Sequence, residues 1–394
     1  MTIRCGVGYS VLPDTAAAVR EACERSKRAF TEDKTDLLLC FSSVIHDQEK
    51  LVACLKECGF SAPLIGCSDA GGLTAEGPFS KGLSLLRLRA DNIKFTIGLG
   101  ENIKKDAYQA GVDLARSILE KDPNIRLLIM LPDGLAGNGA DIVRGVQEVL
   151  GENFPVVGGS AGDDFLFQKT YEYFNDRLLT GAVVGVGLSG DFTFGIGVRH
   201  GWMPIGASMK ATRSKGNVLY ELDDKPAIKI YEEYFGKGKA QVLREEPLAR
   251  IAITYPLGMK TEESDEYLIR DPITVDEAGA ITCAAEIPEG STLRLMIGSK
   301  DEAIQAARVA VAGAVEQMKG RPVKAAIIFN CIARSKLFGR DAGKEVEAIR
   351  EMMGQKVPLI GFYTYGEQAP IAGKINVCSP VFHNETVVIL TLGD

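Results

Sequence analysis

The sequence predicts an α/β fold in which repeated β-α-β-α-β-β-β units form mixed sheets flanked by helices, in a pseudo-symmetric two-domain arrangement. Two observations lead to this prediction. The same order of elements recurs along the chain, and the central strand of each repeat is a solid apolar run. Such runs are typical of strands whose sheet is covered on both faces. With 394 residues, 46% of them hydrophobic, the chain can bury two or three cores.

The first repeat begins with a strand at residues 5–10, followed by a helix over 14–30. Its remaining elements are a buried strand at 37–41, a helix over 47–58, a strand at 63–66, and closing strands at 83–89 and 94–98. Asp47 is a suitable N-cap for the second helix, because its carboxylate can accept a hydrogen bond from the first helical turn.

The second and last repeats follow the same order. The second has its elements at 95–98, 104–120, 127–130, 138–150, 155–158, 182–188 and 192–198. The last has its elements at 293–298, 301–318, 326–329, 343–353, 358–361 and 387–392. The helices are predicted from apolar side chains at helical spacing, such as Val112, Ala115 and Ile118, and Asn138 is a second candidate N-cap.

A divergent unit separates these repeats. It has a predicted helix over 218–234 and predicted strands at 252–255, 267–270 and 281–285. We therefore divide the chain into an N-terminal domain of two repeats (1–210) and a C-terminal domain (211–394) with the divergent unit and the last repeat. Pairing of the first strand with the last strand, 387–392, would protect two sheet edges, and we expect it.

Composition favours a soluble protein of the cytoplasm. The net charge is -7 with both signs interleaved, so no basic stripe suggests nucleic-acid binding. No run of 18 apolar residues predicts a membrane span, and we expect no signal peptide. Nine cysteines without a disulfide framework suggest reduced thiols, and Cys54 and Cys58 are interpreted as packing residues of a helix instead of metal ligands.

The strand ends suggest where a ligand binds. In each repeat a Pro-x-x-Gly strand runs into a small or polar loop, and the second of these loops contains Ser160 and Asp163. Ligands of α/β sheets settle at the carboxyl ends of strands, and glycine lets the backbone approach a ligand closely. Plain tight turns would explain the glycines equally well, so the polar residues carry the hypothesis.

The last repeat has the richest set of polar side chains. Arg334 could pair with a ligand carboxylate and Glu367 with a ligand ammonium, while Cys331, Tyr363 and Gly366 would line the pocket. This arrangement would suit a zwitterion such as an amino acid. The alternative is an internal Arg334–Glu367 salt bridge without any ligand.

Several segments resemble the FIST family. The N-terminal FIST domain is suggested by residues 6–10, 63–68, 155–163 and 200–206, and the C-terminal FIST domain by residues 217–222, 226–227, 287–290, 329–334 and 361–367. The resemblance implies a sensory module for small ligands, with amino acids proposed for the family. It also implies a separate output protein such as a histidine kinase, a chemoreceptor or a cyclic-dinucleotide enzyme, because this chain has no output domain of its own.

The sequence is also compatible with other functions. One subgroup of the family is described as a haem-binding nitric-oxide sensor, for which His46 or His200 would be the axial ligand. A hydrolase or transferase would use Cys331 as its nucleophile, although no convincing base accompanies it. A scaffold without a small ligand is a further alternative. The glycines at 185–190 match a dinucleotide fingerprint, but a strand follows them where a helix is required.

Overall fold

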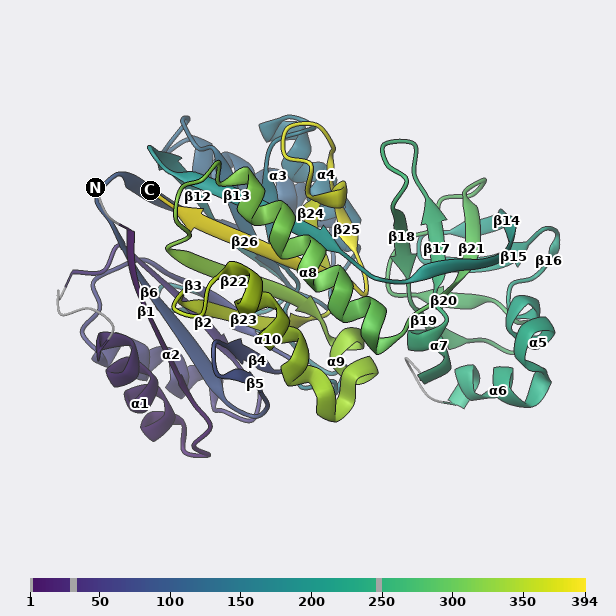
Figure 1. Ribbon diagram of the computed structural model, residues 1–394, viewed down its shortest axis with the longest axis horizontal. Helices are drawn as coiled ribbons and strands as arrows, with labels where there is room; N and C mark the ends of the chain where they lie inside the picture. Colours follow the sequence, from purple (N-terminus) through teal and green to yellow (C-terminus); the bar gives the residue numbers. More distant parts are fainter. Residues whose placement is uncertain (1–2, 29–33, 246–249) are drawn as a thin grey trace.

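Three mixed sheets form the body of the protein, and a fourth sheet forms a separate lobe (Figure 1). The computed structural model describes residues 3–28, 34–245 and 250–394, so residues 29 and 30 of the first predicted helix lie outside the described residues. We call residues 203–297 the lobe and the described remainder the body. In Figure 1 the lobe lies at one end of the long axis, and N and C lie close together at the other.

The body contains three repeats of one topology. In each repeat the last strand lies between the first two strands, and the third strand pairs in parallel with the second. The first repeat consists of β1 (Ile3–Ser10), α1 (Thr15–Arg28), β2 (Leu37–Ser42), α2 (Gln48–Glu57), β3 (Leu64–Ser68), the hairpin β4 (Gly72–Thr74) and β5 (Gly77–Phe79), and β6 (Leu83–Ala90).

The second and third repeats have equivalent elements. The second consists of β7 (Ile93–Gly100), α3 (Ala107–Leu119), β8 (Leu127–Pro132), α4 (Gly139–Leu150), β9 (Val156–Gly159), the hairpin β10 (Glu172–Phe174) and β11 (Arg177–Leu179), and β12 (Val183–Gly190). The third consists of β13 (Thr193–Arg199), α8 (Lys300–Gln317), β22 (Ala325–Cys331), α9 (Ile332–Phe338), α10 (Ala342–Met353), β23 (Leu359–Thr364), the hairpin β24 (Glu367–Pro370) and β25 (Pro380–His383), and β26 (Val387–Gly393).

The hairpins exchange between repeats. β10 extends the first sheet beside β3, β24 extends the second sheet beside β9, and β4 extends the third sheet beside β23. Every repeat thus donates a hairpin to another in a closed cycle. These short hairpins, which lie between the third and last strands of each repeat, were not predicted from the sequence.

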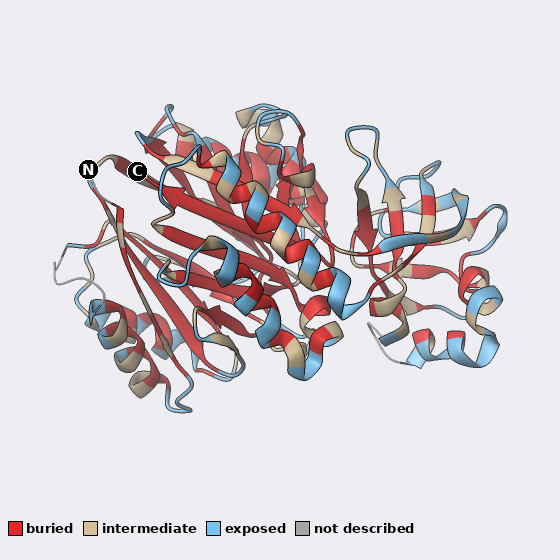
Figure 2. Ribbon diagram, viewed as in Figure 1, coloured by how far each residue is buried: buried red, intermediate tan, exposed pale blue. Residues whose placement is uncertain are grey.

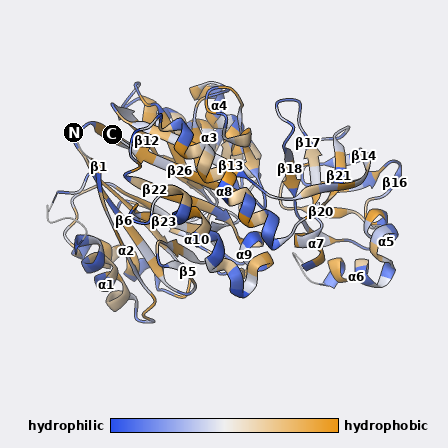
Figure 3. Cartoon of the chain, in the orientation of Figure 1, coloured by the Kyte–Doolittle hydropathy of each residue, from blue (hydrophilic) through white to orange (hydrophobic). Residues whose placement is uncertain are grey.

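One face of each sheet packs into a shared core. Leu39, Ile129 and Ile327, from the central strands of the three sheets, belong to this single cluster. Helices α1 and α2 cover the outer face of the first sheet, α3 and α4 that of the second, and α8 and α10 that of the third. The strands are therefore buried on both faces and strongly apolar, as Figures 2 and 3 show.

Both predicted N-caps are confirmed, since Asp47 accepts from Lys50 N and Asn138 from Ala140 N.

The lobe is inserted between β13 and α8. Its elements are β14 (Met203–Lys215), β15 (Val218–Leu222), β16 (Lys225–Pro226), α5 (Lys229–Phe235), α6 (Lys237–Glu245), α7 (Arg250–Thr254), β17 (Leu257–Lys260), β18 (Tyr267–Arg270), β19 (Pro272–Val275), β20 (Ile281–Cys283) and β21 (Thr292–Ile297). All its strand pairs are antiparallel, unlike those of a repeat, so it is not a divergent copy. Residue 210, where the sequence divides the chain, lies within β14.

Four predictions about individual elements are wrong. The predicted helix 218–234 begins as strands β15 and β16, and the predicted strand 252–255 lies largely in helix α7. The strand at 293–298 belongs to the lobe, while β13 opens the third repeat. The first and last strands do not pair, because β1 pairs with β6 and β26 lies between β13 and β22. A short apolar run predicts that a segment is buried, but it does not predict which strand that segment pairs with.

The cysteines and the helices can be compared with the prediction of reduced thiols and no membrane span. Cys23 on α1 and Cys58 at the end of α2 form a disulfide, contrary to the prediction that all thiols are reduced. The reason is that the two helices lie side by side, which brings the two Cα atoms to 6.6 Å. In the described part of the chain, every helix is too short or too polar to cross a membrane.

Candidate functional site at the junction of body and lobe

The three strand-end loops meet one another inside the body. Ser160 N donates to Gly366 O at 2.8 Å, and Ala70 N donates to Tyr363 O at 3.0 Å. Gly162 N donates to Ser68 O at 3.0 Å, which ties the second loop to the first. The exchanged hairpins bring these loops together, so backbone hydrogen bonds, and not an open hollow, connect the three predicted ligand loops.

Asp163 and Ser160 hold this meeting point together. The Asp163 carboxylate accepts hydrogen bonds from the backbone N–H groups of residues 167, 168 and 169 at 2.6–2.9 Å, and from the Tyr365 hydroxyl. Ser160 Oγ accepts from Gln368 Nε2 at 3.0 Å. Both side chains are buried. Their hydrogen bonds are used within the protein, so the contacts indicate a structural task for both residues.

Arg334 is also committed to the protein. Its Nε and Nη2 donate to Glu345 Oε1 at 3.0 and 2.5 Å, and its remaining N–H groups reach the carbonyl oxygens of His200, Ala303 and Glu385. The predicted alternative of an Arg334–Glu367 salt bridge is therefore wrong, since the partner is Glu345. A ligand carboxylate would find no unused N–H group on Arg334.

Glu367, Tyr363, Gly366 and Cys331 lie in the same buried region. The Glu367 carboxylate accepts from Thr364 Oγ1 and from Thr386 N, the latter at 3.2 Å. Gly366 has φ +155, and an added Cβ would overlap the Phe382 ring. Burial raises the pKa of the Tyr363 hydroxyl.

Cys331 is held as a neutral thiol. Burial and, secondarily, the Glu367 carboxylate raise the pKa of this thiol well above its ordinary value. A nucleophilic cysteine requires the thiolate, which a low pKa supplies. The surroundings of Cys331 therefore oppose the catalytic alternative.

Two acids that the sequence analysis missed complete the region. Asp271 lies between β18 and β19 of the lobe, and Glu385 lies between β25 and β26 of the body. The Asp271 and Glu385 carboxyl groups lie within hydrogen-bonding reach of each other, and both Glu385 carboxylate oxygens and Asp271 Oδ1 are buried without a hydrogen-bond donor from any other group. Buried carboxylates normally have such partners, so this junction has acceptors in excess. Only the packing of the lobe against the body brings these acids together.

The pKa values reflect the same crowding. Burial raises the pKa of Asp271 to about 6, and it raises the pKa of Glu385 well above the ordinary value, with Asp271 adding to the effect. Burial likewise raises the pKa of Glu367. Since an ionised carboxylate gains from a nearby positive charge, a cation at this place would lower these pKa values again.

The junction is the seam between body and lobe. Trp202, on the incoming connection, packs against Ile269 and Met296 of the lobe. Arg199 Nε and His200 Nε2 each lie 3.0 Å from the Glu266 carboxylate across the seam. Within the described residues, no group of three His, Cys, Asp or Glu side chains is placed so that it could hold a metal ion.

The two candidate haem ligands have different surroundings, with His200 in the seam and His46 in the first repeat of the body. His200 Nδ1 accepts from Trp202 N at 2.9 Å and its Nε2 faces Glu266, so both ring nitrogens are engaged. His46 is 2% exposed, and its Nδ1 lies 3.5 Å from Thr15 Oγ1. His200 does not fit an axial ligand, and His46 would fit only if the side chains around it separated.

The fold and the junction define a two-lobed α/β protein with a buried, acceptor-rich seam. The FIST N domain model matches residues 36–225 and the FIST C domain model matches residues 227–370. The chain therefore belongs to the FIST family, whose domains are associated with sensory signal transduction and ligand binding. The predicted resemblance is confirmed.

Two mycobacterial proteins are similar to this chain over nearly its whole length. An uncharacterized protein of Mycobacterium tuberculosis is 26% identical over 378 residues, covering 94% of this chain and 96% of that protein. An uncharacterized protein of Mycobacterium bovis is 23% identical over 383 residues, covering 94% and 95%.

Among solved structures, a chorismatase has a TM-score of 0.38 at 8% identity, covering 100% of this chain and 98% of that one. A cyanuric acid hydrolase has a TM-score of 0.33 at 8% identity, covering 99% and 100%. Likenesses at this level carry no conclusion about this chain.

Proposed function

We propose that this protein is a cytoplasmic small-molecule sensor that binds a ligand ammonium group between Asp271, Glu385 and Glu367. The ligand class is an amino acid or a small amine. The observation that carries the proposal is the Glu385 carboxylate, which is buried with no hydrogen-bond partner other than the neighbouring Asp271 carboxyl group. An ammonium group has three donors and no acceptor, and it would serve both Glu385 oxygens and Asp271 Oδ1.

The position of the acids suggests how binding becomes a signal. Asp271 belongs to the lobe while Glu385 and Glu367 belong to the body, and two connections near residues 201 and 298 join the two parts. A ligand held by both parts would favour the closed arrangement over an open one, because it binds the closed state better. A separate histidine kinase, chemoreceptor or cyclic-dinucleotide enzyme would then respond to the change.

Ligand screening tests this function. Purified protein is heated with each of the twenty amino acids, ethanolamine and putrescine, and hits are measured by titration calorimetry. A true ligand at one hundred times its Kd stabilises the fold by about 2.7 kcal/mol. The Glu385→Gln variant keeps the shape of the side chain but loses its charge, so the ligand should bind at least about tenfold more weakly.

A matched variant provides the control. Glu221→Gln removes a carboxylate from the lobe surface, where Glu221 pairs with Arg213, and it should leave ligand affinity unchanged. If no amine or amino acid raises the melting temperature, or if Glu385→Gln binds as tightly as the unaltered protein, the proposal is wrong. Adding haemin to the same samples tests the haem alternative, which requires a sharp Soret band.

A further inference from the structure

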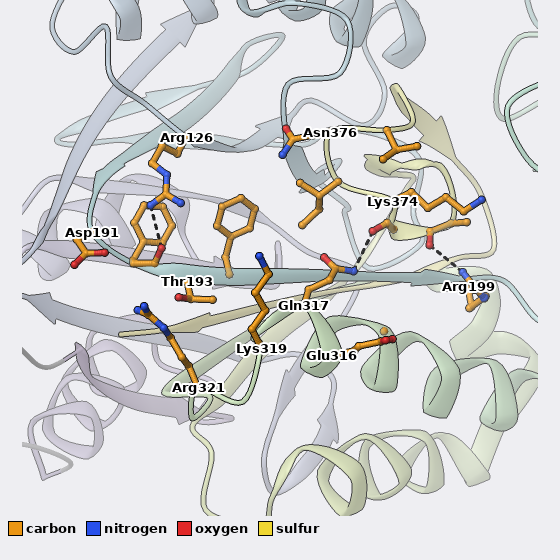
Figure 4. A pocket seen from close by; sticks show the side chains of 17 residues that line it. Arg126, Asp191, Thr193, Arg199, Glu316, Gln317, Lys319, Arg321, Lys374 and Asn376 are labelled. Atoms are coloured by element: carbon orange, nitrogen blue, oxygen red, sulfur yellow. Dashed lines mark hydrogen bonds between the residues drawn. The ribbon is translucent and has the colours of Figure 1, made fainter.

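A basic pocket lies on the body, and none of the junction acids Asp271, Glu367 and Glu385 lines it. It has a volume of about 780 Å³ and is bounded by the β12–β13 turn, strand β13, the end of α8 and residues 372–377 (Figure 4). β13 is an edge strand, and at Ile196 its N–H and C=O are both capped by the Gln317 side chain. Closer to the β12–β13 turn, the unpaired edge of β13 faces the pocket.

The charge of the pocket is opposite to that of the chain. Five basic side chains line it, from Arg126, Arg199, Lys319, Arg321 and Lys374, against the two acids Asp191 and Glu316. The protein as a whole has a net charge of -7. In Figure 4, Arg126 approaches the segment around Thr193 from one side, and Lys319 and Arg321 approach it from the other. A concave, locally positive surface attracts anions.

Part of this positive charge is unused. Arg199 pairs with Glu266, and Arg126 donates to the carbonyl oxygens of residues 190 and 192. Arg321 donates to a backbone carbonyl through one nitrogen, Nη1. Among the described residues, the ammonium groups of Lys319 and Lys374 have no hydrogen-bond or ion-pair partner, so both are available to a ligand.

The pocket also has an apolar wall. The Arg126 guanidinium lies 5.0 Å from the centre of the Phe192 ring, and the Phe194 ring lies 5.6 Å from that ring. Ile375 and Val377 line the pocket as well, and Val377 is 69% exposed. An exposed valine beside a half-buried phenylalanine suits an apolar group better than a bare inorganic ion.

We infer that this pocket binds a small phosphorylated molecule that carries an apolar or aromatic group. The phosphate would be held by Lys319 and Arg321 with help from Arg126, the three cations that surround the Thr193 segment in Figure 4. The apolar group would lie against Phe194 and Val377. The site is separate from the junction acids, so it does not depend on the proposed function.

Titration calorimetry with phenyl phosphate and inorganic phosphate tests this site. Phenyl phosphate should bind more tightly than inorganic phosphate, and its affinity should fall as salt rises. In the double variant Lys319→Glu and Arg321→Glu, phenyl phosphate should bind at least about tenfold more weakly, because two charged contacts are reversed. The variant should fold normally, since both side chains are exposed, and its melting temperature checks this.

A second double variant separates a local site from the general charge. Lys104→Glu and Lys105→Glu make the same charge change at two exposed positions. They follow the Gly100 end of β7, whereas the Ile93 end of that strand pairs with Gly190 next to the pocket. Phenyl phosphate affinity should be unchanged there, and also in Glu385→Gln. The inference is overturned if phenyl phosphate fails to bind at millimolar concentration, if both double variants weaken it equally, or if it binds no better than inorganic phosphate.

Discussion

Arg334 Nη2 donates to Glu345 Oε1 at 2.5 Å, and both side chains are completely buried. This ion pair connects α9 to α10, and Arg334 also reaches the carbonyl oxygen of His200 beside the lobe connection. An ion pair without solvent is costly to break, because the remaining charge stays buried without its partner.

Arg334→Met should therefore lower the free energy of unfolding by about 3–5 kcal/mol, measured by urea denaturation. The exposed pair Arg308–Glu351 is the matched control, and Arg308→Met should cost less than about 1 kcal/mol. Equal losses in the two variants would contradict the structural task that we assign to Arg334.

Stability should decrease as pH rises through the titration of Asp271. Burial raises the pKa of Asp271 from 3.8 to about 6, so between these values the folded protein binds more protons than the unfolded chain. The stabilisation that Asp271 gains from this proton is fully present below about pH 4 and lost above about pH 6. The free energy of unfolding differs by roughly 3 kcal/mol between these two limits. Glu367 and Glu385 act in the same direction.

Urea denaturation at pH values from 4 to 7 measures this trend in the unaltered protein and in Asp271→Asn. The variant should lose less stability across the range, because its amide does not titrate. Glu221→Gln, at the lobe surface, should follow the unaltered protein. A parallel decline in Asp271→Asn would show that the junction acid does not titrate as described.

Asp163→Ala should loosen the loop that follows it. The backbone of Asp164, Phe165 and Phe167 has positive φ, between 53 and 68, a conformation that costs energy in residues other than glycine. The Asp163 carboxylate holds this loop through three backbone N–H groups. Its removal should cost at least about 2 kcal/mol and accelerate hydrogen exchange at 164–169. Asp113→Ala, at an exposed position of α3, should do neither.

Cys331 should resist alkylation in the folded protein. Its thiol is 2% exposed and its pKa is raised well above the ordinary value, whereas the free Cys54 thiol is partly exposed. Treatment with iodoacetamide at pH 7.5, followed by mass spectrometry of peptides, should show modification of Cys54 well before Cys331. Rapid labelling of Cys331 would restore the hypothesis of a nucleophilic cysteine.

The sequence by itself determined the family and most helices and long strands of the body. Apolar runs such as Leu127–Met130 need no distant partner to be recognised as buried strands, and Asn138 caps its helix through a neighbouring residue. The Pro-x-x-Gly strand ends recur in the sequence, and in the structure their loops meet one another through backbone hydrogen bonds. These features are readable because they depend on periodicity and on contacts a few residues apart.

Only the tertiary structure decided which distant segments meet. Hairpin exchange between repeats, the Arg334–Glu345 pair, and the approach of Asp271 to Glu385 all join residues through the packing of whole sheets and helices. Nothing in the local pattern around Asp271 distinguishes it from a surface acid. Asp271 belongs to the candidate site because the lobe packs against the body and buries its carboxyl group. A charged carboxylate is costly only where water is excluded.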